Sequence, residues 1–190
     1  MDKHKLKNRW SVWFHQLNDL DYNSISSLDE KDWKYKGYKE IYRFDTLEGF
    51  WYFYNNHPTL GMGIYFLMKN DILPKWDAKE NLNGGTWSLK ILPDESNNMK
   101  LENIVYNVWE RASIQLINNL LIDNNDRVNG ISIQLKTRSN CGIIQIWSND
   151  TIKKLDNFSI ENVDMVNMIK YFKENNNRRD KFKEYRKRRY

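Results

Sequence analysis

Trp76 and Asp77 are neighbours in a segment that Pro74 and the Gly84-Gly85 pair mark as a loop. The flat face of an indole can stack on a ligand, and an adjacent carboxylate can accept hydrogen bonds from it. A tryptophan in a proline-bounded loop is hard to explain by core packing, and the chain has eight tryptophans in 190 residues. These residues predict a ligand-binding site; the alternative is that Trp76 only anchors its loop.

A second group of aromatic residues lies in the polar stretch 18–39. This stretch has no sustained hydrophobic period and is therefore predicted to be a long surface loop. It contains Trp33, Tyr35 and Tyr38. Loops of this length are often functional, so Trp33 is a candidate binding residue, although a tryptophan can also pin a loop in place.

Patterns typical of catalysis and of metal binding are missing from the sequence. His4, His15 and His57 do not have the spacing of metal ligands, and the lone Cys141 cannot complete a zinc site. There is no Ser/His/Asp order, no phosphate loop and no paired-carboxylate motif. The sequence therefore favours a binding protein with no catalytic residue, metal or cofactor.

The strands are predicted from alternation. Trp10, Val12 and Phe14 alternate with Ser11 and Trp13, which is the period of a β-strand. Further strands are expected at 61–69, 86–92, 130–137 and 142–148, with a turn at 138–141.

Three helices are expected, at 45–55, 99–121 and 160–173, because apolar residues recur there every three or four positions. The first is expected to begin where Asp45 and Glu48 have the spacing of a capping box. Strands interrupted by helices indicate an α+β fold, with an antiparallel sheet and helices on one of its faces.

The length of the chain fits one domain, which we place at 1–177 and follow with a basic tail, 178–190. The tail has eight basic and two acidic residues, so the rest of the chain is nearly neutral although the net charge is +5. Any electrostatic attraction for RNA must come from the tail or from a local patch. The lone cysteine, a start without the apolar stretch of a signal peptide and the absence of a long apolar segment predict a soluble, cytoplasmic protein without membrane contact.

Five short segments resemble the eukaryotic translation initiation factor 4E family in their order and approximate spacing. They are NRWSVWF, FDTLEGFW, PKWD, GGTW and IQIW. The resemblance covers about residues 5–172. It implies a curved antiparallel sheet with three long helices on its convex face, and a slot on the concave face for the 7-methylguanosine cap of messenger RNA.

The resemblance assigns roles to residues of this slot. Trp76 and Trp33 are expected to stack on the two faces of methylated guanine, whose delocalised positive charge adds cation–π attraction; Tyr35 is the alternative to Trp33. Trp147 is expected to contact the N7-methyl group. Asp77, where the family has glutamate, is expected to accept hydrogen bonds from guanine N1–H and the N2 amino group, while the Trp76 N–H donates to O6.

The match is poorer for the cations that would bind the triphosphate bridge. Lys136 stands where the family has an arginine, and Arg138 lies nearby in a hairpin that is two residues longer than usual. Thr86 and Ile143 stand where the family has an arginine and a lysine. Two basic positions are therefore neutral, and lysines of the tail are possible substitutes.

The resemblance also implies a partner-binding face on the convex side. Trp51 matches the family tryptophan at its centre, Leu47 lies beside it, and His4 stands where the family has a His-Pro pair. The expected partner is a scaffold or repressor protein with a helical 4E-binding motif. Glu110 and Arg111 stand where an apolar residue and an acid are expected, which favours a dedicated partner of complementary charge.

The period of the first helix predicts which of its aromatic residues face solvent. Leu47, Trp51 and Tyr54 are expected on one exposed stripe, and Phe50 and Phe53 are expected to turn towards the sheet. A large exposed aromatic residue is typical of a binding hot spot.

The leading hypothesis is a cytoplasmic initiation factor, monomeric apart from its scaffold, that binds capped messenger RNA and recruits it for translation. The alternatives are a cap-binding repressor and an adaptor that keeps only the partner face and has lost cap binding. The abundance of asparagine, lysine and isoleucine suggests an AT-rich genome, such as that of a parasite or a large DNA virus.

Overall fold

The computed structural model describes the side chains of residues 3–16, 38–57, 60, 63–93, 99–121 and 126–150, and the backbone of 125 and 163–171. The predicted stacking residue Trp33, its alternative Tyr35, the domain boundary at 177 and the tail 178–190 lie outside this part of the chain.

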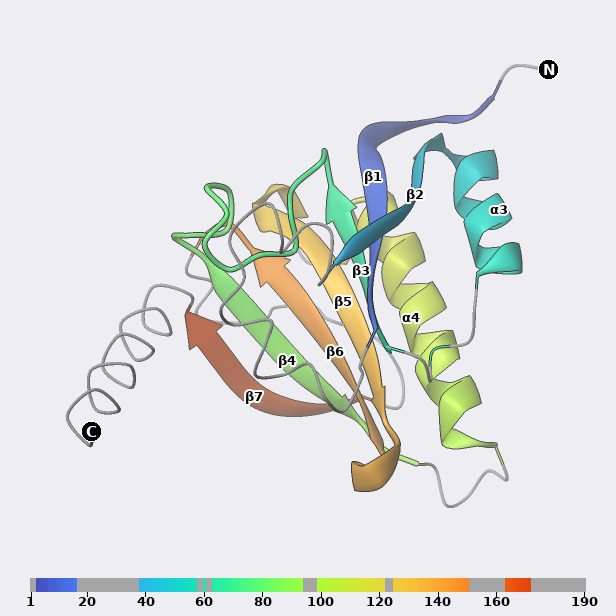
Figure 1. Ribbon diagram of the computed structural model, residues 1–190, viewed down its shortest axis with the longest axis vertical. Helices are drawn as coiled ribbons and strands as arrows, with labels where there is room; N and C mark the ends of the chain where they lie inside the picture. The colour runs from blue at the N-terminus through green and yellow to red at the C-terminus, as the bar shows by residue number, and fades with distance from the viewer. Residues whose placement is uncertain are drawn as a thin grey trace.

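Seven strands form one antiparallel sheet in the order β2-β1-β3-β5-β6-β4-β7 (Figure 1). Their bounds are β1 Lys5–Gln16, β2 Lys39–Thr46, β3 Gly63–Lys69, β4 Gly85–Ile91, β5 Val128–Lys136, β6 Cys141–Ser148 and β7 Val163–Tyr171. The strands predicted for β1, β3, β4, β5 and β6 are confirmed, and the ends of the last four differ from the prediction by one or two residues. The turn between β5 and β6 contains a short 3-10 helix, Thr137–Ser139.

The helices α3 (Leu47–Asn56) and α4 (Leu101–Ile117) lie on the same face of the curved sheet (Figure 1). The main core fills the space between this face and the helices. Its central residues are Trp10 and Val12 of β1, Trp87 and Leu89 of β4, Ile144 and Ile146 of β6, and Val105, Trp109 and Leu116 of α4. The α+β class and the position of the helices are therefore as predicted.

The third predicted helix, 160–173, is wrong, because Val163–Tyr171 forms the strand β7 and pairs with β4. Val163, Val166 and Ile169 have helical spacing, but valine and isoleucine also fit strands well. The edge of β4 offers unpaired backbone groups to this segment, and pairing with it satisfies them. Tertiary context thus overrides the local period, and the described part of the chain has two helices of more than one turn.

No element was predicted for most of β2, which forms one edge of the sheet. Tyr42 and Phe44 turn towards the core, whereas the exposed Arg43 lies between them. This alternation is too short to stand out in a sequence, and the strand runs directly into α3.

The start of α3 lies two residues later than predicted, and its capping residue is Thr46. The Thr46 Oγ1 atom accepts a hydrogen bond from the Gly49 N–H at 3.2 Å. Asp45 pairs instead with Lys5, so the capping box predicted at Asp45 is wrong. Neither of these two described helices is both long and apolar enough to cross a membrane.

Candidate functional site

A second cluster of aromatic residues lies on the sheet face that points away from the helices. Trp13, Phe66, Met68 and Trp147 are buried in it, and the half-buried Trp76 packs against them. Because side chains alternate along a strand, Trp13 lies opposite Trp10 and Val12 of the main core. The structure thus brings Trp76 and Trp147, two residues predicted for one slot, into a single cluster.

Trp76 belongs to the segment 70–84 between β3 and β4, and a buried amide holds this segment together. Asn81 Nδ2 donates hydrogen bonds to the carbonyl oxygens of Leu73 at 2.9 Å and of Lys75 at 2.8 Å. The Lys75 carbonyl and the Trp76 N–H belong to one planar trans peptide unit and point in opposite directions. Asn81 therefore fixes the direction of the Trp76 N–H that was predicted to bind guanine O6.

Asn81 is held in turn by Asn129 of β5, whose Nδ2 atom donates to Asn81 Oδ1 at 2.8 Å and to the Glu80 carbonyl at 2.8 Å. Both asparagines are buried. A buried amide left without partners is destabilising, so this pair strongly favours one conformation of the segment. Sequence reasoning missed it, because asparagine is abundant along this chain and nothing in the spacing of these two residues joins them.

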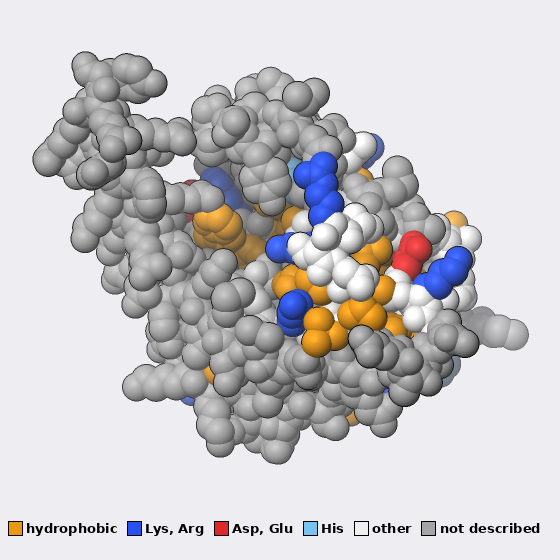
Figure 2. Space-filling model, turned by 90° about the horizontal axis from the view of Figure 1, so that it is seen from below, with side chains coloured by type: hydrophobic (Ala, Val, Ile, Leu, Met, Phe, Trp, Pro, Cys, Tyr) orange, Lys and Arg blue, Asp and Glu red, His pale blue; other side chains and the backbone are white. Residues whose placement is uncertain are grey.

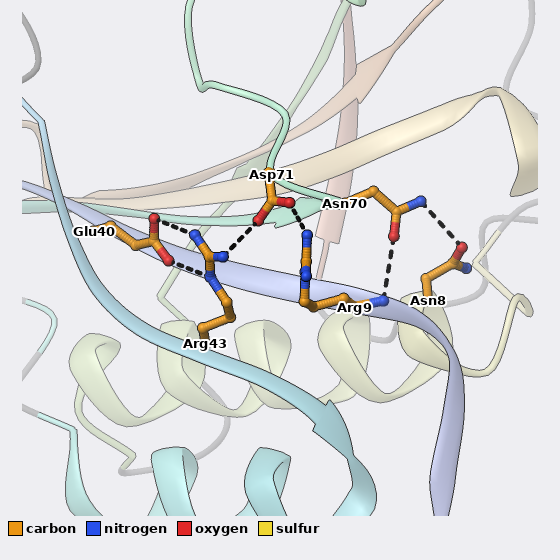
Figure 3. Close-up of polar contacts among 6 residues, drawn as sticks. All are labelled: Asn8, Arg9, Glu40, Arg43, Asn70 and Asp71. Atoms are coloured by element: carbon orange, nitrogen blue, oxygen red, sulfur yellow. Dashed lines mark hydrogen bonds and ion pairs between the residues drawn. The ribbon is translucent and has the colours of Figure 1, made fainter.

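The start of the same segment is tied to the edge of the sheet by a chain of ion pairs (Figure 3). Asp71 pairs with Arg9 of β1 and with Arg43 of β2, the latter at 3.1 Å. Arg43 also donates two hydrogen bonds to Glu40, at 2.7 and 2.9 Å. Each pair is partly exposed and contributes little stability alone, but together they fix where the Trp76 segment leaves β3.

Asn70 and Asp71 make this exit possible, because both have the left-handed backbone conformation, with φ of 48° and 64°. Asparagine and aspartate tolerate this conformation better than other non-glycine residues. Asn70 Oδ1 also accepts a hydrogen bond from the Arg9 N–H at 3.2 Å, which adds a contact to β1.

The Trp147 ring is fixed by a row of polar side chains that crosses three strands. Its Nε1–H donates to Ser132 Oγ of β5 at 3.0 Å, and Ser132 lies beside Gln145 of β6. Gln145 Nε2 donates to Ser88 Oγ of β4 at 2.9 Å. The ring also packs edge-on against Phe66, with the ring centres 5.9 Å apart.

Asp77, predicted to read the guanine edge, follows Trp76 directly and its side chain is 55% exposed. Its Oδ1 atom lies 3.4 Å from Lys75 Nζ. The carboxylate is therefore accessible to a ligand, which would share it with the Lys75 ammonium.

The residues predicted to bind phosphate lie at the opposite end of the concave face. Lys136 is the last residue of β5, Arg138 lies in the following 3-10 turn, and both are exposed. Figure 2 views the molecule from the side on which this turn lies, and lysine and arginine side chains stand out there beside a hydrophobic area. Thr86 is buried and Ile143 half-buried, and neither supplies charge.

The predicted partner-binding residues Leu47 and Trp51 lie on α3, on the other side of the sheet, and are 36% and 39% exposed. Phe50 and Phe53 are buried towards the sheet, as predicted. The prediction that Tyr54 shares the exposed stripe is wrong, because Tyr54 is buried against α4.

The hydroxyl group of Tyr54 donates to Ser113 Oγ at 2.5 Å, and the Trp109 carbonyl lies 3.3 Å away. Burial raises the pKa of Tyr54 well above its ordinary value. A tyrosine is amphipathic, so its ring can be buried when its hydroxyl group has a hydrogen-bond partner, as Tyr54 has on α4.

His4, the third predicted partner-binding residue, contacts the start of α3. The Leu47 N–H donates to the His4 carbonyl at 2.9 Å, and His4 Nδ1 lies 2.7 Å from Glu48 Oε1. The His4 N–H also donates to the Glu48 carboxylate, at 3.1 and 3.2 Å. The chain before β1 is thereby joined to the helix that carries Trp51.

We expect this contact to appear in the titration of Glu48. The side-chain hydrogen bond with His4, followed by backbone N–H groups, lowers the pKa of Glu48 from 4.5 to about 2. A depressed pKa stabilises the folded state above pH 4.5, and this contribution is lost as the pH falls through 2. Carboxyl chemical shifts measured by NMR should give the midpoint directly.

The matched control for that titration is His4→Ala, which should raise the Glu48 midpoint only part of the way, because the backbone N–H groups of Glu48 and of residue 4 remain. A wild-type midpoint at the ordinary value of glutamate would show that His4 does not contact α3 in solution.

Comparisons with known proteins agree with this architecture. The family model described as "Eukaryotic initiation factor 4E" matches residues 5–189. Among curated relatives, "Eukaryotic translation initiation factor 4E-1A" of Danio rerio is 31% identical over 143 residues, which is 73% of this chain and 59% of the relative. The Dictyostelium discoideum "Eukaryotic translation initiation factor 4E" is 36% identical over 93 residues, which is 47% of this chain and 34% of the relative.

Two solved structures share the fold at lower identity. A complex of C. elegans eIF4E-3 with the 4E-binding protein Mextli has a TM-score of 0.62 and 21% identity, and covers 79% of this chain and 78% of that one. Ascaris suum eIF4E-3 with m7G cap has a TM-score of 0.60 and 23% identity, and covers 80% and 77%.

The chain spans about a third to three fifths of the length of these curated relatives. The family match nevertheless covers almost all of its residues, and the matched range contains both the Trp76 cluster and the exposed face of α3. The chain belongs to the eukaryotic initiation factor 4E family.

Proposed function

We propose that this protein binds the 7-methylguanosine cap of messenger RNA on the concave face and recruits it for translation through a scaffold protein on the convex face. The observation that carries the proposal is the position of Trp76. It is half-buried on an aromatic cluster that contains Trp147, and its segment is held by Asn81 and Asp71. A rigid, accessible indole beside a carboxylate suits a flat cation with hydrogen-bond donors on its edge.

Related proteins support both halves of the proposal. The solved Ascaris suum eIF4E-3 holds an m7G cap, and the C. elegans eIF4E-3 holds the 4E-binding protein Mextli. In our proposal Trp33 supplies the second stacking face, Asp77 reads the guanine edge, and Lys136 and Arg138 contact phosphate. The binding domain is 1–177, the basic tail 178–190 extends it, and the protein acts in the cytoplasm without catalytic activity.

Fluorescence titration with 7-methyl-GTP and with GTP tests the cap assignment. We expect the methylated ligand to bind at least about tenfold more tightly, because only methylated guanine carries the positive charge that indole faces attract. Stacking should also quench tryptophan emission. Equal affinities for the two nucleotides would refute the assignment and leave the adaptor function as the better explanation.

A further inference from the structure

Lys90 of β4 lies on the concave face, two residues along the strand from a member of the polar row. In the register of the sheet, Thr86 pairs with Trp147, Ser88 with Gln145 and Lys90 with Ile143. The hydrogen bond between Ser88 and Gln145 places the side chains of this set on the face away from the helices. Leu89 and Ile91 point the other way, into the main core.

The Lys90 side chain is half-buried, and within the described residues its ammonium group has no hydrogen bond or ion pair. On one side Lys90 pairs with the apolar Ile143 of β6. On the other side the backbone register pairs Lys90 with Asp164 of β7. A partly desolvated ammonium group without a hydrogen-bond acceptor can bind an anion. The alternative is that Lys90 has only a structural role, in pairing β4 with β7.

Lys136 lies on the other side of β6. It pairs with Cys141, and Ile143 is two residues further along the same strand. Neighbouring strands are about 4.8 Å apart and residues rise about 3.3 Å, so the Cα atoms of Lys90 and Lys136 are about 12 Å apart across β6. Two extended lysine side chains can bridge most of that distance and approach the same polyphosphate.

The distance to the aromatic cluster also fits a nucleotide. Trp147 and Ile143 are four residues apart on β6, which is about 13 Å along the strand. A nucleoside triphosphate with its base beside Trp147 is therefore long enough for its phosphates to reach the pair of lysines along β6.

We propose that Lys90 and Lys136 form a phosphate clamp across β6, which binds the polyphosphate bridge of the ligand held at Trp76. This inference rests on the proposed function. It assigns to Lys90 of β4 the positive charge that is missing at Ile143 of β6. The clamp places on β4 the cation that the resemblance would place on β6, at the residue that pairs with Ile143.

The experiment is a calorimetric titration of wild-type protein and Lys90→Gln with 7-methyl-GTP and with 7-methylguanosine. We expect wild-type protein to prefer the triphosphate, and Lys90→Gln to lose at least about fivefold in affinity for it but less than twofold for the nucleoside. The decrease of triphosphate affinity with rising salt concentration should be weaker in Lys90→Gln than in wild-type protein, because one charged contact to phosphate is lost. Lys90→Arg should retain most of the preference.

Two further variants make the result specific. Lys100→Gln removes the same charge at an exposed position just before α4, on the helix side, and should leave both affinities unchanged. Lys90→Gln combined with Ile143→Lys should recover the triphosphate preference, because it restores a cation one strand away.

Each outcome decides between a ligand-binding and a structural lysine. An equal loss for both ligands, or a lower melting temperature with unchanged binding, would overturn the clamp and show that Lys90 only supports the sheet. If wild-type protein did not distinguish 7-methyl-GTP from GTP, the cap assignment would fail, and comparing GTP with inorganic triphosphate on the same variants would still test the clamp.

Discussion

Trp76→Ala is expected to weaken binding of 7-methyl-GTP by about 2–4 kcal/mol, because it removes one of the two stacking faces proposed for the base. The indole packs against the concave cluster while staying half-exposed, so its loss also removes a part of that packing. We expect the free energy of unfolding to fall by about 1 kcal/mol, roughly half the value of a fully buried side chain. Calorimetry and urea denaturation measure the two effects separately.

Leu82→Ala is the matched control for that variant. Leu82 lies in the same segment, is 39% exposed and is outside the cluster that holds Trp76. It should leave ligand binding unchanged. If Trp76→Ala lost several kcal/mol of stability and bound the ligand normally, Trp76 would be a packing residue and the concave-slot proposal would be wrong.

Trp51→Ala is expected to weaken binding of a helical 4E-binding peptide by about 2–4 kcal/mol, because an exposed aromatic residue commonly dominates a small helical interface. Trp51 packs edge-on against Phe50 of the core and leaves its other side accessible. The helices and the Trp76 cluster lie on opposite faces of the sheet, so 7-methyl-GTP affinity should be unchanged. Titration of each variant with peptide and with nucleotide checks both statements.

Tyr52→Ala tests whether the effect belongs to Trp51 alone. Tyr52 is 63% exposed on the same helix and stacks on Tyr42 of β2, with the ring centres 5.8 Å apart. We expect a loss of less than 1 kcal/mol in peptide affinity, because this tyrosine already has an aromatic partner within the protein. Equal losses for Trp51→Ala and Tyr52→Ala would indicate a broad contact rather than one dominant residue.

Elements with a clear hydrophobic period could be predicted from the sequence. Alternation at Trp10, Val12 and Phe14 identified β1, and the ladder from Leu101 to Leu116 identified α4. The prediction for segment 160–173 failed because its apolar spacing fits a helix. Val163–Tyr171 forms a strand because it pairs with the neighbouring edge of β4. Local patterns contain no information about which edge is free.

The sequence offered candidate residues of a conspicuous type, and it missed residues that meet only through strand register. A tryptophan in a polar loop stands out, so Trp76 was a candidate from the sequence, and the structure packs it against the cluster that contains Trp147. Asn81 and Asn129 are 48 residues apart, and Lys90 meets Ile143 only through strand pairing. The roles of Trp33, Trp76, Asp77 and Trp147, and that of the tail, remain predictions.

The polar row through Ser132 has a consequence for the thermodynamics of binding. Trp147 cannot change rotamer without breaking its hydrogen bond to Ser132 and leaving a buried donor without a partner. In the proposed slot, this ring therefore has its final geometry before a ligand arrives, and a ligand that packs beside it would pay little conformational entropy there. Burial of an apolar ring surface against a rigid wall should give a negative heat-capacity change with a favourable enthalpy, even for a ligand as small as the free methylated base.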